Sequence, residues 1–521
     1  MHRVLTTALA AGGLVAAALG AAAPAGADGG PPPEQWRSYW VDAFNEGVYN
    51  QEQVDRLVED ALAVNANALI VQIARRYDCF CNRALYPRTD AAIAPEPYDP
   101  LDAIIEAAHE AGIEVHAWVN VNTMWNSATP HSSPDHVANQ HGLTAEGRDR
   151  WLNKRVDGAE RIGNNLYVDP GHPDARDYIV EAIQSIVREY DVDGINLDYV
   201  RYPDFNSTTT HSDWGYNETS LARFQAASGR TDIPAANDPQ WLDWRRDQVT
   251  ALVRKIYLGI WEVDPQARLS MDGITYGFGP QSVGGWEKTR TYAEVLQDWK
   301  GWLEEGIMDT VVAMNYKRNW LPPQDQMFSE WTEVIADWQG DRQAVNGPAL
   351  YLNSVADSVE QVEEILRPTD AGNVAAGWSG YSYANPSNAF VGGPWADRSA
   401  ERDALAAALT APGAPFQHPA AVPEMTWKTQ PTDGHVIGTL VLEDGTPLDN
   451  VTVTLTPVGG GEQITQKSDG SGWFGFVHVD PGQYLARIDR PAGIDGQPTA
   501  YVVVEPGEIS TATFRNLEPA D

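Results

Sequence analysis

The sequence predicts an α/β protein, in which a (β/α)8 TIM barrel is followed by a C-terminal all-β immunoglobulin-like sandwich. Between Trp36 and about Tyr383, short apolar runs alternate with amphipathic runs of helical period, and no antiparallel hairpin signals separate them. After residue 433 the pattern changes to short alternating runs separated by turns such as Glu443-Asp444-Gly445, which is typical of a small sandwich. These two patterns predict two folded domains in that order.

Eight apolar runs are the predicted barrel strands. Each leads into a polar or aromatic loop and then a helix, such as Gln51–Asn65 after the first strand and Pro100–Ala111 after the second. The loops are longest after the second, third and fourth strands, on the side where barrel enzymes bind substrates, so we expect a cleft for a polymer. The predicted strands are Tyr39–Phe44, Ala68–Ala74, Glu114–Val119, the run Asp193–Pro203, Arg268–Asp272, Thr310–Asn315, Ala349–Leu352 and Val374–Trp378.

The chain is expected to contain four segments. Arg3, an apolar run to Ala23 and the small residues before Asp28 predict a secretory signal peptide over residues 1–27, with an uncleaved anchor as the alternative. No later run is long and apolar enough to span a bilayer, so we expect a secreted, extracellular protein without a membrane partner. The barrel is predicted over residues 36–410, a linker rich in Pro, Gly and Ala over 411–433, and the sandwich over 434–519.

The composition narrows the range of partners. A formal charge of -36, from 36 Lys and Arg and 72 Asp and Glu, argues against nucleic acid, since no basic cluster is present to neutralise phosphates. The 19 Trp and 20 Tyr offer faces on which sugar rings stack, although for any single Trp, packing between barrel helices is the simpler explanation. No Gly-rich phosphate loop follows the first strand, and no cofactor or catalytic metal is expected, although Asp-rich turns would suit a structural Ca²⁺. The composition leaves the oligomeric state open.

Cys79 and Cys81 are the two cysteines of the chain. A bridge across one intervening residue is cramped, because bridged Cα atoms normally lie ~4.4 to 6.8 Å apart in particular orientations. The pair also lacks the further Cys or His ligands of a zinc site. The sequence leaves a local disulfide and two free thiols as alternatives.

The run Asp193–Pro203 is the centre of the predicted site. It follows an amphipathic helical run and has the pattern of a buried strand, in which Asn196 and Asp198 share the polar side. Asp198 is the last residue on that side, at the strand end where barrel enzymes carry their catalytic groups. The alternative for Asp198 is a structural contact with Arg201 or with a loop amide.

Hydrolysis of a glycosidic bond needs two carboxyl groups, one ionised and one protonated. Asp198 is the predicted nucleophile or base. Asp272, on the same side of the fifth strand as Ser270, is its predicted partner, with a turn cap before Gly273 as the alternative role. Glu287, in the loop after that strand, is a second candidate for the acid if the loop folds over the site.

Strand ends and loops also supply candidate sugar-binding side chains. Aromatic faces stack on sugar rings, and polar or charged groups bind their hydroxyls. For Trp118 and Trp378, core packing is an equal alternative. The predicted substrate-binding residues are Asp42, Arg76, Trp118, Asn120, Tyr199, Arg201, Trp214, Asn315, Tyr316 and Trp378.

Together these motifs resemble the bacterial glycosyl-hydrolase-like family ten, whose domain is a (β/α)8 barrel. Besides the run Asp193–Pro203, the resemblance rests on Trp40–Phe44, Val71–Ile73 leading into Arg75-Arg76, Val115–Asn120, Val168–Pro173 and Met314–Lys317, in this order. The resemblance implies a glycoside hydrolase that acts on cell-wall or other bacterial glycan, with peptidoglycan strands as the leading candidate.

The central motif also resembles the chitinase-type family eighteen signature, in which a strand carries three spaced Asp and ends in a catalytic Glu. Asp193 and Asp198 match the first and last Asp. Asn196 replaces the middle one, and Val200 stands where the Glu would be. The chitinase acid is therefore missing, and chitinase chemistry does not carry over.

Short motifs near the C-terminus, including Asp444–Leu448 and Gly472–Phe476, resemble the carboxypeptidase-regulatory-like fold of extracellular proteins. That resemblance implies an accessory module without a catalytic role.

From these observations we expect a secreted glycoside hydrolase whose substrate is a polysaccharide or an oligosaccharide. One alternative is a non-catalytic glycan-binding barrel that has lost its acid, as Val200 suggests. Another is an α-glycosidase that cleaves a short oligosaccharide through an aspartate nucleophile on the fourth strand. A carboxylate of the fifth strand close to Asp198 would favour an enzyme over a binding protein.

Overall fold

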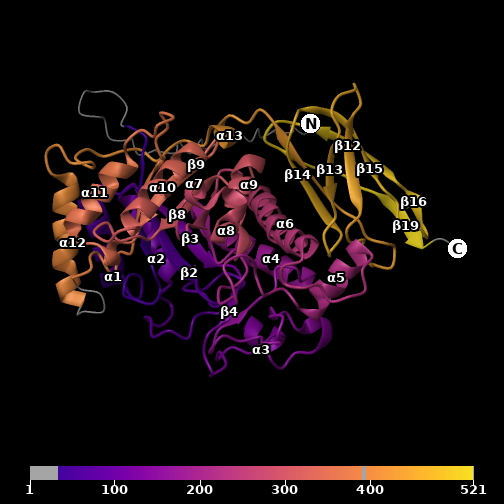
Figure 1. Ribbon diagram of the computed structural model, residues 1–521, viewed down its shortest axis with the longest axis horizontal. Coiled ribbons are helices and arrows are strands. Elements are labelled where there is room, and N and C mark those ends of the chain that lie inside the picture. Colours follow the sequence, from indigo (N-terminus) through magenta and orange to yellow (C-terminus); the bar gives the residue numbers. More distant parts are fainter. Residues whose placement is uncertain (1–32, 390–394, 520–521) are drawn as a thin grey trace, which may run out of the picture.

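The computed structural model describes residues 33–389 and 395–519, so the predicted signal peptide lies outside the described residues. Eight parallel strands form a closed barrel in the order β1-β10-β9-β8-β7-β6-β3-β2, with helices around it (Figure 1). This confirms the predicted TIM barrel. The barrel strands are β1 (Trp36–Val41), β2 (Ala68–Ala74), β3 (Glu114–Asn120), β6 (Gly194–Asp198), β7 (Arg268–Ile274), β8 (Thr310–Asn315), β9 (Gln343–Pro348) and β10 (Gly377–Tyr381).

The seventh strand differs from its prediction. Residues Ala349–Leu352 were expected to form it, but Leu350–Leu352 is a short 3-10 helix, and the strand is β9. The sequence of β9 has no continuous apolar run, because it carries polar residues such as Asn346, whose amide donates to Thr332 Oγ1 at 2.8 Å. The eighth strand also starts later than expected, at Gly377, and the first starts earlier, at Trp36.

Capping residues mark where the barrel helices begin. Asn50 accepts a hydrogen bond from the backbone of Gln53, and Asp99 does the same for the first turn that starts at Pro100. Pro at the first helical position loses no hydrogen bond, so these signals stop the preceding loop and start the helix. The main helices are α1 (Gln51–Ala63), α2 (Pro100–Glu110), α4 (Pro173–Glu189), α6 (Pro239–Val263), α9 (Trp299–Glu305), α10 (Gln324–Asp337), α11 (Val355–Ile365) and α12 (Trp395–Thr410).

Large aromatic side chains fill the barrel interior. Trp36, Trp40 and Trp118 are buried there in one cluster with smaller apolar residues of the strands. Nearer the carboxyl ends of the strands, the rings of Tyr316 and Tyr381 lie 6.3 and 5.9 Å from the ring of Trp40. The barrel is therefore a packed core whose upper aromatic layer forms the floor of its mouth.

Long segments follow β2, β3 and β6, as the sequence predicts. The segment after β2 contains a disulfide between Cys79 and Cys81, whose Cα atoms lie 5.0 Å apart, and this settles the alternatives left open above. The later segments carry small extra elements: the pair β4 (Thr123–Trp125) and β5 (Leu166–Tyr167), α3 (Val137–His141) and α5 (Glu218–Ser228), while α7 (Pro280–Val283) and α8 (Arg290–Ala293) follow β7.

The C-terminal residues form β-sheets, as predicted. A three-stranded sheet in the order β14-β11-β18 and a four-stranded sheet in the order β13-β12-β15-β17 share one apolar core, and all of their strand pairs are antiparallel except β11 with β18. A two-stranded sheet pairs β16 with β19. The strands are β11 (Gly434–Thr439), β12 (Thr452–Pro457), β13 (Ile464–Lys467), β14 (Trp473–Val479), β15 (Gly482–Ile488), β16 (Ile494–Gln497), β17 (Thr499–Val504), β18 (Ile509–Thr511) and β19 (Arg515–Pro519).

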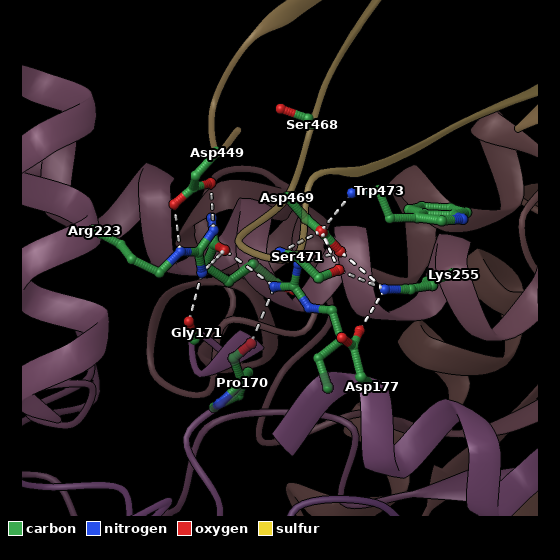
Figure 2. A network of polar contacts seen from close by, with 12 residues as sticks. Pro170, Gly171, Asp177, Arg223, Lys255, Asp449, Ser468, Asp469, Ser471 and Trp473 are labelled. Atoms are coloured by element: carbon green, nitrogen blue, oxygen red, sulfur yellow. Dashed lines mark hydrogen bonds and ion pairs between the residues drawn. The ribbon is translucent and has the colours of Figure 1, made fainter. Parts of the chain in front are cut away.

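Ion pairs connect these sheets to α4, α5 and α6 of the barrel (Figure 2). Asp469 lies between Arg176 and Lys255, at 3.3 and 3.4 Å, and the side chains of Asp469 and Arg176 are almost fully buried. Burial raises the pKa of Asp469, but Arg176 and Lys255 outweigh it and hold that pKa at about 2. A second pair joins Asp449 to Arg223 through two hydrogen bonds of 2.7 and 2.9 Å.

The segment predicted as a linker lies against the barrel. Phe416 is buried beside Trp378, and Ala421 pairs with Glu34 next to β1. A short helix, α13 (Thr426–Thr429), carries Lys428, whose ammonium lies 2.9 Å from the fully buried carboxylate of Asp309. Across residues 33–389 and 395–519, the length and apolar content needed to cross a membrane are not combined in any helix.

Candidate functional site

A pocket of about 570 Å³ opens at the carboxyl ends of the barrel strands. This is the end at which barrel enzymes bind substrates. Six of the predicted site residues line it, namely Asp198, Asp272, Trp118, Tyr199, Arg201 and Tyr316. The other lining residues are Ile274, Thr275, Tyr276, Gly277, Met314, Lys317, Arg318, Pro323, Gln324, Met327 and Tyr381.

Strand register brings Asp198 and Asp272 side by side. The neighbouring strands β6 and β7 pair Leu197 with Met271, so that Asp198 and Asp272 are the next residues on each strand. Neighbouring strands lie ~4.8 Å apart, and residues at one level of a parallel barrel face the same side. The two carboxylates therefore share one corner of the pocket, and both side chains are almost completely buried.

Indole and backbone N–H groups hold the two carboxylates. Trp40 Nε1 donates to Asp272 Oδ1 at 3.0 Å, and Trp118 Nε1 lies 3.3 Å from Asp198 Oδ2. The backbone N–H of Tyr199 donates to Asp198 Oδ1 at 2.7 Å. Tyr199 has a left-handed backbone, with φ of 52°, which is uncommon for an aromatic residue and is typical of residues held in place at a functional site.

The environment separates the pKa values of the pair. Burial raises the pKa of Asp198 to about 6, and the charge of Arg201, the Tyr199 N–H and the Trp118 N–H limit the rise. Burial raises the pKa of Asp272 well above its usual range, and the negative charge of Asp198 raises it further. Of the two groups, Asp198 therefore loses its proton at the lower pH, and Asp272 keeps its proton to higher pH.

A polar cluster stands beside Asp198. Arg201 Nη1 donates to Asp204 Oδ2 at 2.9 Å, and its guanidinium carbon lies 4.5 Å from the centre of the Tyr199 ring. The hydroxyl of Tyr276 donates to the other oxygen of Asp204 at 3.1 Å. Arg201 is thus fixed by Asp204 and does not form a direct ion pair with Asp198, which leaves the Asp198 carboxylate facing the pocket.

Three predicted residues lie close to the pocket without lining it. Asn120 accepts hydrogen bonds from Trp118 Nε1 at 3.0 Å and from Gln72 at 3.2 Å, so that it positions the Trp118 ring. Beside the effect of burial, the charge of Asp42 raises the pKa of Tyr381. Burial raises the pKa of Tyr199, and the guanidinium of Arg76 limits that rise. Asp42 and Arg76 follow the ends of β1 and β2, and Asn120 is the last residue of β3.

Other predicted residues lie elsewhere. Glu287 borders a separate depression on the outer side of the barrel, with Asp243 and Arg246. Trp378 is buried between Tyr39 and Phe416 in the core outside the strands. Trp214 is also fully buried, and its indole donates to the backbone oxygen of Asp204 at 3.2 Å.

Asn315 is also placed away from the pocket, because its amide donates to the backbone of Phe328 in α10 at 3.1 Å. It is the last residue of β8, whose neighbours Met314 and Tyr316 line the pocket. Alternation along the strand turns Asn315 toward the helices. The expected sugar contact of Asn315 therefore has no counterpart in the observed geometry.

The lining residues Tyr276, Lys317, Arg318 and Tyr381 were not among the predicted site residues, and neither were Trp40 and Asp204, which hydrogen-bond to residues that line the pocket. The alternation of β1 contained a signal for Trp40, since it points to the barrel interior when Val41 points to the helices. Tyr276 and Lys317 follow strand ends, a position that favours function. Within the described residues, no three His, Cys, Asp or Glu side chains form a group of metal ligands.

Comparisons with known proteins find relatives that are described as glycosyl hydrolases. The chain is 27% identical over 334 residues to the glycosyl hydrolase YngK of Bacillus subtilis, covering 61% of this chain and 58% of YngK. It is 24% identical over 331 residues to the glycosyl hydrolase DigH of Escherichia coli, covering 58% of this chain and 65% of DigH. In both cases the match thus spans less than two thirds of the relative.

The fold has solved counterparts. The glycoside hydrolase domain of PgaB (BpsB) from Bordetella bronchiseptica superimposes with a TM-score of 0.50 at 16% identity, over 72% of this chain and 99% of that domain. At this identity the likeness concerns the fold. Residues 35–364, more than half of the chain and all but one of the barrel strands, match the family described as Glycosyl hydrolase-like 10, and the chain therefore belongs to that family.

Proposed function

We propose that this protein is a glycoside hydrolase in which Asp198 and Asp272 do the chemistry. The proposal is based on two adjacent, buried carboxyl groups at the barrel mouth, of which Asp272 has the higher pKa and Asp198 the lower one. Such a pair supplies one ionised and one protonated group at the same pH, which is what cleavage of a glycosidic bond needs. A purely structural pair gains nothing from this costly burial of charge.

Each carboxyl group takes the role that its environment favours. Asp272 is protonated and donates its proton to the leaving glycosidic oxygen. Asp198, ionised and held by the Tyr199 N–H and the Trp118 indole, attacks the anomeric carbon or stabilises the positive charge that develops there. Tyr316 and Tyr381, whose rings stack 5.1 Å apart, form the apolar wall on which a sugar ring can lie.

The proposed substrate is a bacterial glycan, with peptidoglycan strands as the first candidate, and the proposed location is extracellular. Membership of a glycosyl hydrolase-like family supports a carbohydrate substrate. The disulfide Cys79–Cys81 supports export, because disulfides persist mainly in oxidising compartments. The N-terminal pattern of residues 1–27 supports it as well.

The first experiment measures the release of reducing ends from purified glycans by the wild-type protein. The panel includes peptide-free peptidoglycan strands, neutral β-glucans and chitin, together with short α-linked oligosaccharides for the aspartate-nucleophile alternative. We expect cleavage of the bacterial polymer. Binding of a glycan without cleavage of any member of the panel would identify a lectin-like barrel and would overturn the proposal.

The spacing of the carboxyl groups predicts retention of anomeric configuration. Adjacent strands place them nearer to the ~5 to 5.5 Å of retaining enzymes than to the ~6.5 to 9.5 Å of inverting enzymes. Proton NMR of a freshly mixed reaction reports the configuration of the first product before mutarotation. Formation of the inverted anomer would contradict this prediction and would remove Asp198 from the role of nucleophile.

The pH dependence of kcat/KM should be bell-shaped. Asp198 must lose its proton, so activity should rise with an apparent pKa near 6, and it should fall at higher pH as Asp272 loses its own. Because the carboxyl groups interact, both apparent values belong to the pair. The profile is measured between pH 4 and pH 9, and full activity maintained down to pH 4 would contradict the assignment.

A further inference from the structure

The pocket contains two basic residues that form no ion pair with any acidic residue that the structure describes. Lys317 and Arg318 are consecutive residues after β8, and both line the pocket. Within the described part of the chain, neither side chain forms an ion pair, whereas Arg201 in the same pocket is paired with Asp204. The chain has twice as many acidic as basic residues, 72 against 36, so partners for cations are plentiful. Two adjacent basic side chains without an ion pair among the described residues are therefore candidates for binding an anionic ligand.

The ammonium group of Lys317 donates to uncharged oxygen atoms. Its side chain is almost fully buried, and Nζ donates to the backbone oxygen of Thr275 at 2.8 Å and to Thr275 Oγ1 at 3.4 Å. The Thr275 hydroxyl in turn donates to the backbone oxygen of Met314 at 2.8 Å. An ammonium group carries three donors, and burial of its charge is costly without an anion nearby. Among the described residues, no carboxylate forms an ion pair with this ammonium group.

The backbone that carries both cations is fixed. Asn353 Nδ2 donates to the backbone oxygen of Lys317 at 2.9 Å, and Asn353 Oδ1 accepts from the N–H of Asn319 at 2.8 Å. Gln324 Oε1 accepts from the N–H of Arg318 at 2.9 Å. Side chains on a fixed backbone lose less entropy when they bind a ligand, which is the usual arrangement of a recognition site.

Lys317 and Arg318 are not among the groups that shift the pKa of Asp272. Burial alone lowers the pKa of Lys317 to about 7, without a contribution from Asp198 or Asp272. The groups that shift the pKa of Asp272 are likewise Asp198, Trp40 and Asn196, but neither Lys317 nor Arg318. Along the strands, Asp272 pairs with Val312 of β8, whereas Lys317 and Arg318 follow the end of that strand, so the basic side of the pocket lies nearer its opening and can contact another part of the substrate.

We propose that Lys317 and Arg318 form a subsite for the carboxylate of an acidic sugar, next to the sugar whose bond is cleaved. A guanidinium binds a carboxylate through two parallel hydrogen bonds, and an ammonium adds a point charge. This inference rests on the proposed function and extends it from glycans in general to glycans that carry carboxylates on their sugars. Lys317 and Arg318 are then specificity-determining residues, and they take no part in proton transfer.

The test compares two probes that differ in charge. Peptide-free peptidoglycan strands carry a carboxylate on every second sugar, and chemical reduction of these carboxylates to alcohols makes a neutral polymer of the same linkage. We expect kcat/KM of the wild type to be about 10-fold or more higher on the acidic strands, as for a buried charge-assisted hydrogen bond. Equal values on both probes would overturn the subsite.

Two variants connect this preference to the residues. In Arg318→Gln and in Lys317→Met, the ratio of kcat/KM between acidic and reduced strands should fall toward one. Arg318 is only partly buried, so Arg318→Gln should fold normally, and a thermal melt checks both proteins. Arg367→Gln is the matched control, because Arg367 has a side chain that is 67% exposed. It should keep the wild-type ratio, and an unchanged ratio in both pocket variants would contradict the proposal.

The failure of this inference can be distinguished from failure of the proposed function. If the wild type cleaves neither probe, the hydrolase proposal fails, and the subsite is then tested by titration calorimetry of the same two polymers. Tighter binding of the acidic strands, lost in Arg318→Gln, would support the subsite in a non-catalytic protein. Equal affinity for the acidic and reduced strands would overturn it.

Discussion

Replacement of Asp198 by Asn should lower kcat/KM by about 10³-fold or more on the glycan that the wild type cleaves. Asn keeps the shape of the side chain and removes its charge, so the ionised group that faces the anomeric carbon is lost while the pocket remains. The loss should appear in kcat, because the carboxylate acts mainly in the transition state. Steady-state kinetics on the reducing-end assay measures both parameters.

Asp272→Asn is the companion variant, since it removes the proton donor and leaves the ionised group in place. Its activity on the glycan should also fall strongly, but an aryl glycoside with a good leaving group needs little protonation and should be spared. Asp198→Asn should be inactive on both substrates. A variant pair in which Asp198→Asn keeps more than about a tenth of the wild-type rate would remove Asp198 from the chemistry.

Asp198→Asn should also stabilise the fold at high pH. The folded-state pKa of Asp198, about 6, lies above the ordinary value of 3.8, so folding favours the protonated form and the ionised form is penalised. At pH 8 the removal of this charge should raise the free energy of unfolding by up to about 3 kcal/mol. The gain should be absent below pH 4, where the carboxyl is protonated in both states. Urea titrations at the two pH values test this sign.

Replacement of Asp469 by Asn should destabilise the contact between the barrel and the C-terminal sheets by about 3 kcal/mol or more. The change leaves the fully buried Arg176 without its anion, and breaking one side of a buried ion pair typically costs about 3 to 5 kcal/mol. Asp469 also accepts the backbone N–H groups of Ser471 and Trp473, so the turn that carries it is weakened as well. Differential scanning calorimetry should show the sheets melting apart from the barrel.

Asp449→Asn provides the control for this prediction. Asp449 pairs with Arg223 in the same interface, but its side chain is 30% exposed, so water replaces part of the lost contact and the cost should be about 1 kcal/mol or less.

Because the pKa of Asp469 is depressed to about 2, the contribution of Asp469 to the free energy of unfolding is present above pH 4 and is lost as the pH falls through 2. Equal destabilisation by both variants would show that the buried pair has no special role.

The sequence by itself determined the barrel and its central pair. The alternation of apolar strands and amphipathic helices has one closed solution in which every strand buries both faces. Asp198 and Asp272 could be predicted because both are polar residues at the carboxyl ends of buried strands. β9 was missed for the opposite reason, since the polar residues of its sequence find partners only in the folded barrel, as Asn346 does with Thr332.

The tertiary structure decided which loop and aromatic residues meet. Tyr276 and Lys317 lie close after the ends of β7 and β8 and line the pocket, whereas Glu287 and Trp214 lie farther along the segments after β7 and β6, and loop paths place them away from it. A local pattern carries no information on such paths, which depend on contacts between distant segments. Arg176 and Asp469 are separated by 293 residues in the sequence, and only folding brings the Arg176 guanidinium to the Asp469 carboxylate.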